Sequence, residues 1–292
     1  MKINFTKDPL LVLISIQVIM AGTYLMTKLG LREFSPLTLG VLRFGLTAAI
    51  FTVLLAFRRM YFIPDKKDFP IFLWLALLAV PFNQGLFLYG MKFTLAAHGA
   101  LLYATTPIMV LCLSCIWLKE RLSLFKIIGI TLGFSGVLLV LFEKGINFSG
   151  QTFKGDILLF FAVLTWSLYT ILSKKMLKKY QPLQVTGYSL TLGALLFLPI
   201  GILPLIRQDY GIVTRSGLFS ILYLAILTSV LGYLTWNWAL SKIEASKVAV
   251  VSNLQPIFAA LLAWVFLGEK ITAAFIVGAL IVASGVVLTE LG

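Results

Sequence analysis

The chain consists of long apolar stretches separated by short polar ones. Each apolar stretch has about 20 residues, the length that a helix needs to cross the roughly 30 Å hydrocarbon core of a bilayer. Ten such stretches follow one another, and the polar segments between them are too short to form a separate soluble domain. The pattern therefore predicts an all-α integral membrane protein with ten transmembrane helices. Their approximate ranges are 9–28, 36–57, 70–91, 97–118, 124–142, 156–174, 183–206, 217–240, 245–267 and 272–290.

A longer pattern repeats within this one. Residues 96–140 align without a gap with residues 245–289, 149 positions later, and 13 of the 45 aligned positions are identical. Together with a similar alignment of the earlier helices, this predicts an internal duplication, with a first repeat at 1–143 and a second at 144–292. The identities that apolar composition alone does not supply are Pro107 and Pro256, Glu120 and Glu269, Gly129 and Gly278, Ser135 and Ser284, and Gly136 and Gly285.

The number of helices in each repeat sets the relative orientation of the two repeats. Each repeat has five predicted helices, and because five is odd the second repeat enters the membrane from the opposite side. Inverted repeats recur in secondary transporters, where an exchange of conformation between the halves moves the access pathway across a fixed site near the midplane. The expected fold class is therefore two inverted five-helix repeats, which favours an alternating-access transporter.

Composition and charge agree with a bilayer environment and predict the topology. Of the 292 residues, 60% are hydrophobic and 12% are charged, against roughly 25% charged residues in soluble domains. The net charge of +13 does not indicate a nucleic-acid partner, because the basic residues are spread over the ends of the predicted helices. With a cytoplasmic N-terminus, 15 Lys and Arg fall inside and 8 outside. The excess of basic residues in cytoplasmic loops predicts a plasma (inner) membrane protein with both termini cytoplasmic.

Four segments resemble the EamA family of the drug/metabolite transporter superfamily. "AGTYLMTKLGLREFSPLTLGVLRF" and "LTWSLYTILSKKMLKKYQPLQVTGYSLTLGALLFLP" are similar to the first two helices of each EamA repeat. "TPIMVLCLSCIWLKERLS" and "QPIFAALLAWVFLGEKIT" are similar to the hairpins between the fourth and fifth and between the ninth and tenth helices. The resemblance covers nearly the whole chain. It implies a ten-helix inverted-repeat carrier that exports small metabolites, often amino acids, and it does not name the substrate.

Polar and aromatic side chains inside the predicted helices are the candidates for a substrate site. Polar groups in hydrocarbon are costly unless they are paired or hydrated. Taken singly, an aromatic residue near a helix end is more often an interface anchor, and a lone amide often binds a neighbouring helix. However, Gln84 and Phe87 align by repeat with Tyr233 and Trp236, which suggests matched walls. The substrate-binding candidates are Gln17, Tyr24, Arg43, Asn83, Gln84, Phe87, Tyr103, Trp166, Tyr169, Tyr233, Trp236, Asn237, Asn253 and Gln255.

Arg43 is the most informative single charge among these candidates. It lies seven residues past Pro36, about 10 Å along a helix, and its counterpart in the second repeat is Ser189. All eleven acidic residues lie in loops or at helix ends, so no carboxylate partner is evident at this depth. Arg43 is expected either to pair with a substrate carboxylate through two hydrogen bonds or to extend toward the interface or helix-end carbonyls.

The lack of an intramembrane carboxylate also bears on coupling. Proton-coupled export of cationic drugs usually needs an embedded Asp or Glu, and the only histidine, His98, falls at a helix end. We therefore expect neutral or zwitterionic cargo that moves by facilitated diffusion or exchange. The alternative is a carrier for multiple drugs or nucleotide sugars, with proton coupling.

An enzyme, a metal site and a cofactor are not expected. The sequence has no HExxH motif, phosphate-binding loop or nucleophile elbow, and no cluster of catalytic residue types at depth. Cys112 and Cys115 could form a metal or redox pair, but no histidine or second cysteine pair lies near them. We interpret both as apolar packing residues.

Prolines, acidic corners and glycines mark the duplicated hairpins. Pro107 and Pro256 fall in the middle of the fourth and ninth predicted helices, where each removes a backbone hydrogen bond and favours a kink; the kinks are either hinges or static bends. We interpret Glu120 and Glu269 as structural corners of the two hairpins, followed by the helix caps Ser123 and Thr272.

Small residues allow helices to approach closely, within the bundle or between protomers of a homodimer, and we favour the bundle. The relevant glycines are 129, 133, 136, 278 and 285.

Overall fold

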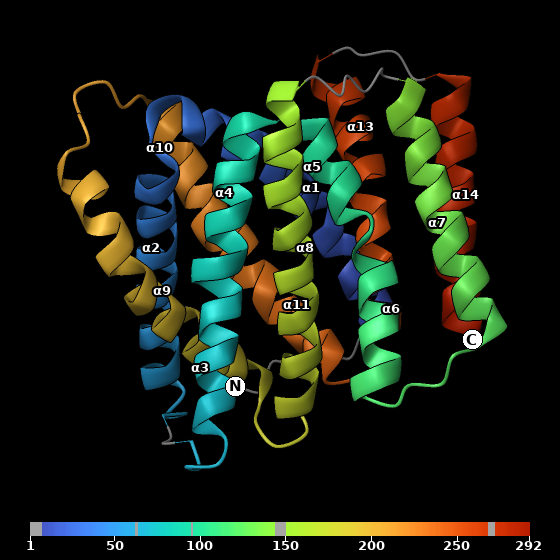
Figure 1. The fold of residues 1–292 in the computed structure, drawn as a ribbon, viewed down its shortest axis with the longest axis horizontal. Coiled ribbons are helices and arrows are strands. Elements are labelled where there is room, and N and C mark those ends of the chain that lie inside the picture. The colour runs from blue at the N-terminus through green and yellow to red at the C-terminus, as the bar shows by residue number, and fades with distance from the viewer. Residues whose placement is uncertain (1–7, 62–63, 95, 144–149, 268–271) are drawn as a thin grey trace.

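The structure is a computed structural model that describes residues 8–61, 64–94, 96–143, 150–267 and 272–292. All regular structure in these ranges is helical, and the long helices stand side by side across the molecule (Figure 1). The all-α prediction is therefore confirmed.

The first half of the chain contains helices whose starts follow from local sequence. Asp8 and Ser35 lie directly before Pro9 and Pro36, and their side chains accept hydrogen bonds from Leu10 N and Thr38 N. A capping side chain followed by proline at the first helical position is a strong helix start. The elements are α1 (Pro9–Glu33), α2 (Pro36–Phe57), α3 (Phe69–Leu77), the π-helical η1 (Leu78–Phe82), α4 (Asn83–Phe93), α5 (Ala96–Tyr103), α6 (Thr106–Trp117) and α7 (Leu124–Glu143).

The second half repeats this order of elements. In Figure 1 its first helix runs from the edge where α1 ends toward the edge where α1 begins, as expected for an inverted second half. The elements are α8 (Gly150–Met176), α9 (Pro182–Ile206), α10 (Arg215–Leu222), the π-helical η2 (Tyr223–Gly232), α11 (Tyr233–Leu240), α12 (Ala245–Val250), the 3₁₀ turn η3 (Val251–Asn253), α13 (Leu254–Leu267) and α14 (Ala273–Leu291).

Eight helical stretches in the described residues are long and apolar enough to cross a membrane. They correspond to eight of the ten predicted spans. The predicted span 124–142 corresponds to α7, which runs from Leu124 to Glu143. The predicted span 245–267 is not one helix, because η3 interrupts it between α12 and α13.

The fourth and ninth spans are interrupted near their middles, each by a short segment that is not regular α-helix. Ala104 and Thr105 form a turn between α5 and α6, and Pro107 lies in the first turn of α6. Pro256 lies in the first turn of α13, directly after η3. Proline is tolerated in a first turn because the amide hydrogen that it lacks has no intrahelical acceptor there. Each proline therefore lies in the first turn of the second helical segment of its span, and the choice between a hinge and a static bend stays a prediction.

The packing interleaves the two halves. Helix α1 packs against η2 and α13 of the second half, and α8 packs in the equivalent way against α4 and α6 of the first half. Helices α2 and α9 pack extensively against each other. Each half therefore completes the wall of the other, and the polar side chains of both halves meet inside the bundle.

Helices α7 and α14 form a close pair at one side of the bundle (Figure 1). Glycines make this approach necessary: a Cβ atom added to Gly129 would lie 2.6 Å from the Gly285 carbonyl oxygen, and one added to Gly136 would lie 2.7 Å from that of Gly278. The prediction that these glycines pack helices within the bundle is confirmed.

The acidic corner at Glu120 joins the two halves. Its carboxylate accepts hydrogen bonds from Ala245 N at 2.7 Å and Ser246 Oγ at 2.8 Å, so it caps α12 of the second half. Ser123 and Thr272 cap α7 and α14 by accepting from Lys126 N and Phe275 N, each at 3.1 Å, as predicted. The equivalent corner, Glu269, lies outside the described residues.

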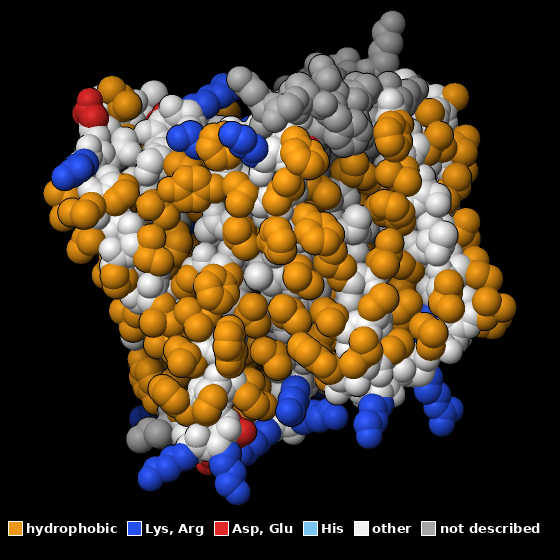
Figure 2. Space-filling view, in the orientation of Figure 1, with side chains coloured by type: hydrophobic (Ala, Val, Ile, Leu, Met, Phe, Trp, Pro, Cys, Tyr) orange, Lys and Arg blue, Asp and Glu red, His pale blue; other side chains and the backbone are white. Residues whose placement is uncertain are grey.

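The surface has the layering of a membrane protein. Hydrophobic side chains cover the middle of the face shown in Figure 2, while Lys and Arg gather at its two edges. Several of these basic side chains project from the edge at which α1 begins and α14 ends. This is the edge that the count of basic residues predicts to be cytoplasmic.

Candidate functional site

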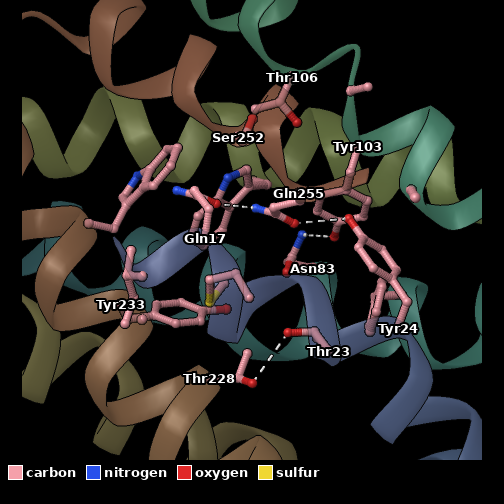
Figure 3. Close-up of a pocket in the computed structure, with 18 of the residues that line it drawn as sticks. Gln17, Thr23, Tyr24, Asn83, Tyr103, Thr106, Thr228, Tyr233, Ser252 and Gln255 are labelled. Carbon is pink, nitrogen blue, oxygen red and sulfur yellow. Dashed lines mark hydrogen bonds between the residues drawn. The ribbon is translucent and has the colours of Figure 1, made fainter. Parts of the chain in front are cut away.

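A cavity lies between the two halves, in the region where the fourth and ninth spans break (Figure 3). Its volume is about 70 Å³, several times the roughly 10–15 Å³ that one water molecule needs. The space therefore suits a small molecule. The lining residues are Ile16, Gln17, Met20, Thr23, Tyr24, Arg43, Asn83, Gln84, Phe87, Ala100, Tyr103, Ala104, Thr106, Trp166, Thr228, Gly232, Tyr233, Trp236, Ser252, Gln255 and Pro256.

Most of the predicted site residues meet in this cavity. Eleven of the fourteen substrate-binding candidates line it, and so does one of the two proposed hinge residues, Pro256. They come from distant parts of both repeats, so their convergence is a product of the fold. The eleven are Gln17, Tyr24, Arg43, Asn83, Gln84, Phe87, Tyr103, Trp166, Tyr233, Trp236 and Gln255.

Arg43 anchors a hydrogen-bond network at the cavity wall. Its side chain donates from Nε to Ser229 Oγ at 2.8 Å and from Nη1 to Gln84 Oε1 at 2.9 Å. Only 1% of its surface is exposed, so it does not extend toward the membrane interface. The network continues from Gln84 Nε2 to Asn83 Oδ1 at 2.6 Å and to Tyr233 OH at 3.2 Å.

The direction of this network is fixed at both of its ends. Asn83 Nδ2 donates to the Ala162 carbonyl oxygen at 2.6 Å, a group that can only accept. At the other end Arg43 can only donate. Asn83 Nδ2 also donates to Tyr103 OH at 3.2 Å. Tyr103 therefore receives a hydrogen bond and keeps its own hydroxyl hydrogen for an acceptor in the cavity.

A second polar group crosses the cavity between the halves. Gln255 Nε2 donates to Gln17 Oε1 at 2.8 Å, and Tyr24 OH donates to Gln255 Oε1 at 3.4 Å (Figure 3). The hydroxyls of Thr23 and Thr228 lie 3.3 Å apart. Each contact joins α1 to a helix of the second half, so the cavity wall is continuous across the repeat interface.

Two groups of aromatic rings form apolar walls. Tyr24, Phe87 and Tyr103 pack edge to face, with centroids 5.6 to 6.2 Å apart. Trp166 packs against Tyr233 at 5.0 Å and against Trp236 at 5.3 Å. Such rings present flat apolar surface with little freedom to move, which suits an apolar part of a small ligand.

Two candidates, Tyr169 and Asn237, lie behind the wall. Asn237 Nδ2 donates to Tyr169 OH at 2.9 Å and to Thr186 Oγ1 at 2.8 Å. Successive helical residues point about 100° apart, so Asn237 faces α9 while Trp236 faces the cavity. Both side chains contribute to helix packing rather than to the cavity lining.

Asn253 and Pro107 also lie outside the cavity lining. Asn253 is buried against Gly133 of α7, and its amide oxygen and nitrogen have no hydrogen-bond partner. Pro107 is buried near the cavity lining, in the first turn of α6. Asn253 precedes Gln255 by two residues, roughly 200° around a helix, so its side chain points away from the cavity that Gln255 lines.

Four hydroxyl residues of the lining were missed by the sequence analysis. Serine and threonine give little signal, because in helices they often bond to the carbonyl four residues before. The repeat, however, contains a signal that could have found two of them. At the offset of 149, Thr106 is the counterpart of Gln255 and Ser252 is the counterpart of Tyr103. The four missed residues are Thr23, Thr106, Thr228 and Ser252.

The chemistry of the lining is cationic and otherwise neutral. Arg43 is the charged residue among the lining residues, and none of them is Asp or Glu. An uncompensated buried cation attracts an anionic group. Within the described part of the chain, no group of three His, Cys, Asp or Glu side chains is placed to hold a metal ion. The side chain of His98 lies outside the described residues.

Two equivalent lysines, one in α1 and one in α8, bind carbonyl groups at the ends of neighbouring helices, at opposite ends of the bundle. Lys28 of α1 donates to the Thr94 carbonyl oxygen, and Thr94 Oγ1 donates to Asp156 of α8 at 2.6 Å. Lys174 of α8 donates to the carbonyl oxygens of Leu240 and Ile243 at 2.6 and 2.7 Å. These contacts tie together the two helix groups that enclose the cavity.

An ionic cluster between the halves lies at the end of the bundle where α1 begins. Lys179 Nζ donates to Asp68 Oδ2 at 2.6 Å and also binds Asp65, and Tyr180 OH donates to Asp68 Oδ2 at 2.7 Å. The hydrogen bonds from Lys179 and Tyr180 hold the pKa of the Asp68 carboxyl below its ordinary value. The same pairing with Asp65 and Asp68 raises the pKa of Lys179.

Comparison with known proteins identifies related chains. The model of the EamA-like transporter family matches residues 9–142 and 153–291. An uncharacterized transporter of Archaeoglobus fulgidus is 30% identical over 93% of both chains. A Salmonella typhimurium protein named a probable amino-acid metabolite efflux pump is 28% identical, over 98% of this chain and 95% of its own. A solved crystal structure is 17% identical to this chain, and the match covers 97% of this chain and 98% of the other. Its TM-score of 0.80 shows that the two proteins have the same fold.

Proposed function

The chain belongs to the EamA-like transporter family, and from this premise we propose that it exports small zwitterionic or neutral metabolites, such as amino acids, as a secondary transporter. The relative from Salmonella typhimurium, named for amino-acid metabolite efflux, supports this class of cargo. The protein is a multi-pass membrane protein, and we place it in the plasma membrane with both termini cytoplasmic, from its count of basic residues.

The composition of the cavity carries the proposal. Arg43 supplies one positive charge to a lining without carboxylates, and amides and hydroxyls supply donors and acceptors. This combination favours a ligand with one negative group and other groups that are neutral or hydrogen-bonded. The donors Nε and Nη1 of Arg43 already bind Ser229 and Gln84. We therefore propose that Arg43 attracts the cargo through its charge and its oriented partners, rather than by a bidentate contact.

The mechanism follows from the interleaved packing. One group of helices consists of α1, η2 and α13, and its counterpart consists of α8, α4 and α6. We propose that these two groups rock against each other around the cavity, so that it opens first to one side of the membrane and then to the other. The helix breaks beside Pro107 and Pro256 are the proposed hinges.

The alternative is a carrier for larger or cationic cargo. A nucleotide sugar is larger than a cavity of about 70 Å³ accommodates, and an organic cation would be repelled by Arg43. Proton coupling through a carboxylate would require an Asp or Glu at the cavity, and the lining residues include neither. The geometry therefore favours small cargo and facilitated diffusion or exchange.

Counterflow in proteoliposomes tests the proposal. Vesicles containing the purified full chain would be loaded with one unlabelled amino acid, nucleoside or organic cation, and the uptake of the same labelled compound would be measured without an ion gradient. We expect transient accumulation for one or more amino acids. Transport of organic cations alone, or only with a proton gradient, would contradict the proposal.

A further inference from the structure

The break in the fourth span directs a helix N-terminus at the cavity. Helix α6 has 12 residues, and its first residue, Thr106, lines the cavity together with Ala104 of the preceding turn. In the first turn of α6, Pro107 has no amide hydrogen and Ile108 N donates to the Thr105 carbonyl oxygen at 3.1 Å, which leaves the amide of Thr106. The side chain at the cap position, that of Thr105, accepts no hydrogen bond from these amides; its hydroxyl donates to the Leu102 carbonyl oxygen at 2.6 Å.

Thr106 adds an unpaired donor at the same place. Its hydroxyl has no hydrogen-bond partner, although the residue is only 1% exposed and lines the cavity (Figure 3). Buried polar groups in proteins are nearly always hydrogen-bonded, and an exception calls for an explanation. A ligand that accepts a hydrogen bond from Thr106 explains this one.

The charge of the surroundings selects an anionic acceptor. The N-terminal end of a helix attracts anions through its free amide hydrogens and its dipole. Arg43 lies in the lining of the same cavity, which has no Asp or Glu. Tyr103, three residues before Thr106, keeps a hydroxyl hydrogen free because Asn83 already donates to it.

The equivalent position in the second half is occupied by the protein itself. Gln255, the repeat counterpart of Thr106, donates to Gln17 and accepts from Tyr24. Its polar atoms are therefore satisfied at the start of α13, whereas the hydroxyl at the start of α6 is not. Of the two breaks, the one before α6 is open to a ligand.

We propose that the carboxylate of the cargo binds at the N-terminus of α6, where it accepts hydrogen bonds from the hydroxyl and the backbone amide of Thr106. This assignment deepens the proposed function and rests on it. The carboxylate could belong to a zwitterionic amino acid or to a simple organic acid, and the two are separated below by matched ligands.

Binding to the purified full chain in detergent tests the assignment without requiring transport. The probes are α-amino acids of increasing size, each with its des-amino acid and its carboxamide. The variants are Thr106→Val, which removes only the hydroxyl, and Thr106→Ser, which restores it. Thr27→Val is the matched control, because the Thr27 hydroxyl is also buried and unpaired but lies outside the cavity lining.

We expect ligands with a carboxylate to bind and their carboxamides to bind at least about tenfold more weakly, since hydrogen bonds to charged groups are the stronger kind. Thr106→Val should raise the Kd of the carboxylate by about tenfold, while Thr106→Ser and Thr27→Val should leave it within about twofold, with unchanged melting temperatures. Binding of amino acids and des-amino acids alike would assign the subsite to any carboxylate; binding of amino acids alone would assign it to the zwitterion.

The assignment is wrong if no carboxylate binds the wild-type chain, if carboxamides bind equally well, or if Thr106→Val binds carboxylates as the wild type does. Counterflow that persists for amino acids in Thr106→Val with unchanged KM would also overturn it and leave the proposed function standing. Thr106-dependent binding of carboxylates without any counterflow would have the opposite meaning: the subsite exists, and the proposed transport is wrong.

Discussion

At the scale of single residues, the buried Arg43 is the feature that most constrains function. A cation at this depth is costly unless other groups compensate it, and Ser229 and Gln84 compensate it with hydrogen bonds but not with charge. The remaining positive potential is available to cargo. Arg43 therefore has a role that depends on its charge and another that depends on its hydrogen bonds.

These roles are separable by Arg43→Gln, which removes the charge and retains a hydrogen-bonding side chain. We expect the KM for a transported amino acid to rise by about tenfold or more, equivalent to about 1.4 kcal/mol, with a change in Tm of only a few degrees. Arg43→Lys, which restores the charge without the planar fork, should recover part of the loss. An unchanged KM in Arg43→Gln would show that the charge does not act on the cargo.

The Asp68 carboxylate provides a pH-dependent contact between the halves. Because its pKa is lower in the folded protein than its ordinary 3.8, the pairing stabilises the fold fully above that value and is lost as the pH falls through the lowered pKa. The difference in Tm between the wild type and Asp68→Asn should therefore be constant near neutral pH and shrink below about pH 3.8. A difference that grew in acid would contradict the assignment.

The sequence predicted which residues belong to the site better than it predicted which way their side chains point. Polar and aromatic residues within apolar stretches pointed to most of the lining, including Gln84 and Trp236. The direction in which a side chain points depends on its rotation about the helix axis. The helix breaks and π-helical turns change this rotation for the residues that follow them. Asn237 and Trp236 are neighbours in sequence, yet one contacts Tyr169 and the other lines the cavity.

At the scale of elements, the breaks and π-helical segments occur in equivalent places in both halves. Segments η1 and η2 directly precede Asn83 and Tyr233, which belong to the cavity network. Only Pro81 within η1 hints at its segment from sequence, and η2 has no comparable signal. Apolar length and capping residues predicted where helices begin, whereas a break and a kink look alike in sequence, because proline fits both.

The glycine contacts between α7 and α14 give a stability prediction at this scale. In Gly129→Ala the new Cβ would meet backbone atoms, at 2.6 Å from Gly285 O and 2.7 Å from Thr289 N. Backbone cannot move aside by changing rotamer, so the helices must separate, at a cost of about 1–3 kcal/mol. Thermal unfolding in detergent measures this cost.

Gly45→Ala is the matched control for that substitution. It is also a glycine within a helix, but an added Cβ would have no atom within 4 Å. Alanine is favoured over glycine in a helix by up to about 1 kcal/mol, so this variant should be as stable as the wild type or more so. Equal loss of stability in both variants would exclude close packing as the cause.

At the scale of the whole molecule, Lys28 and Lys174 occupy equivalent positions at opposite ends of the cavity. Lys28 of α1 binds the end of α4, which packs on α8, and Lys174 of α8 binds the end of α11, which packs on α1. For the cavity to open toward one end, the contact at that end has to break. We therefore expect the two lysines to stabilise closure on opposite sides of the membrane.

Accessibility of the cavity from each side checks this expectation. Ser252→Cys would report from the lining, in a background in which Cys112 and Cys115 are replaced, with a membrane-impermeant thiol reagent added to one side of oriented vesicles. Lys28→Met should raise the labelling rate several-fold from the side where α1 ends, and Lys174→Met from the side where α1 begins. Faster labelling from the same side in both variants would contradict opposed roles.

The asymmetry between Arg43 and its counterpart Ser189 has a stereochemical consequence. The two repeats share one helical fold, but the positive charge of Arg43, the open start of α6 and the tryptophan side chains of the cavity wall have no equivalent in the other repeat. A bound molecule therefore meets the same chiral surroundings whichever side it enters from. The preference between mirror-image forms of a cargo should then be the same for influx and efflux.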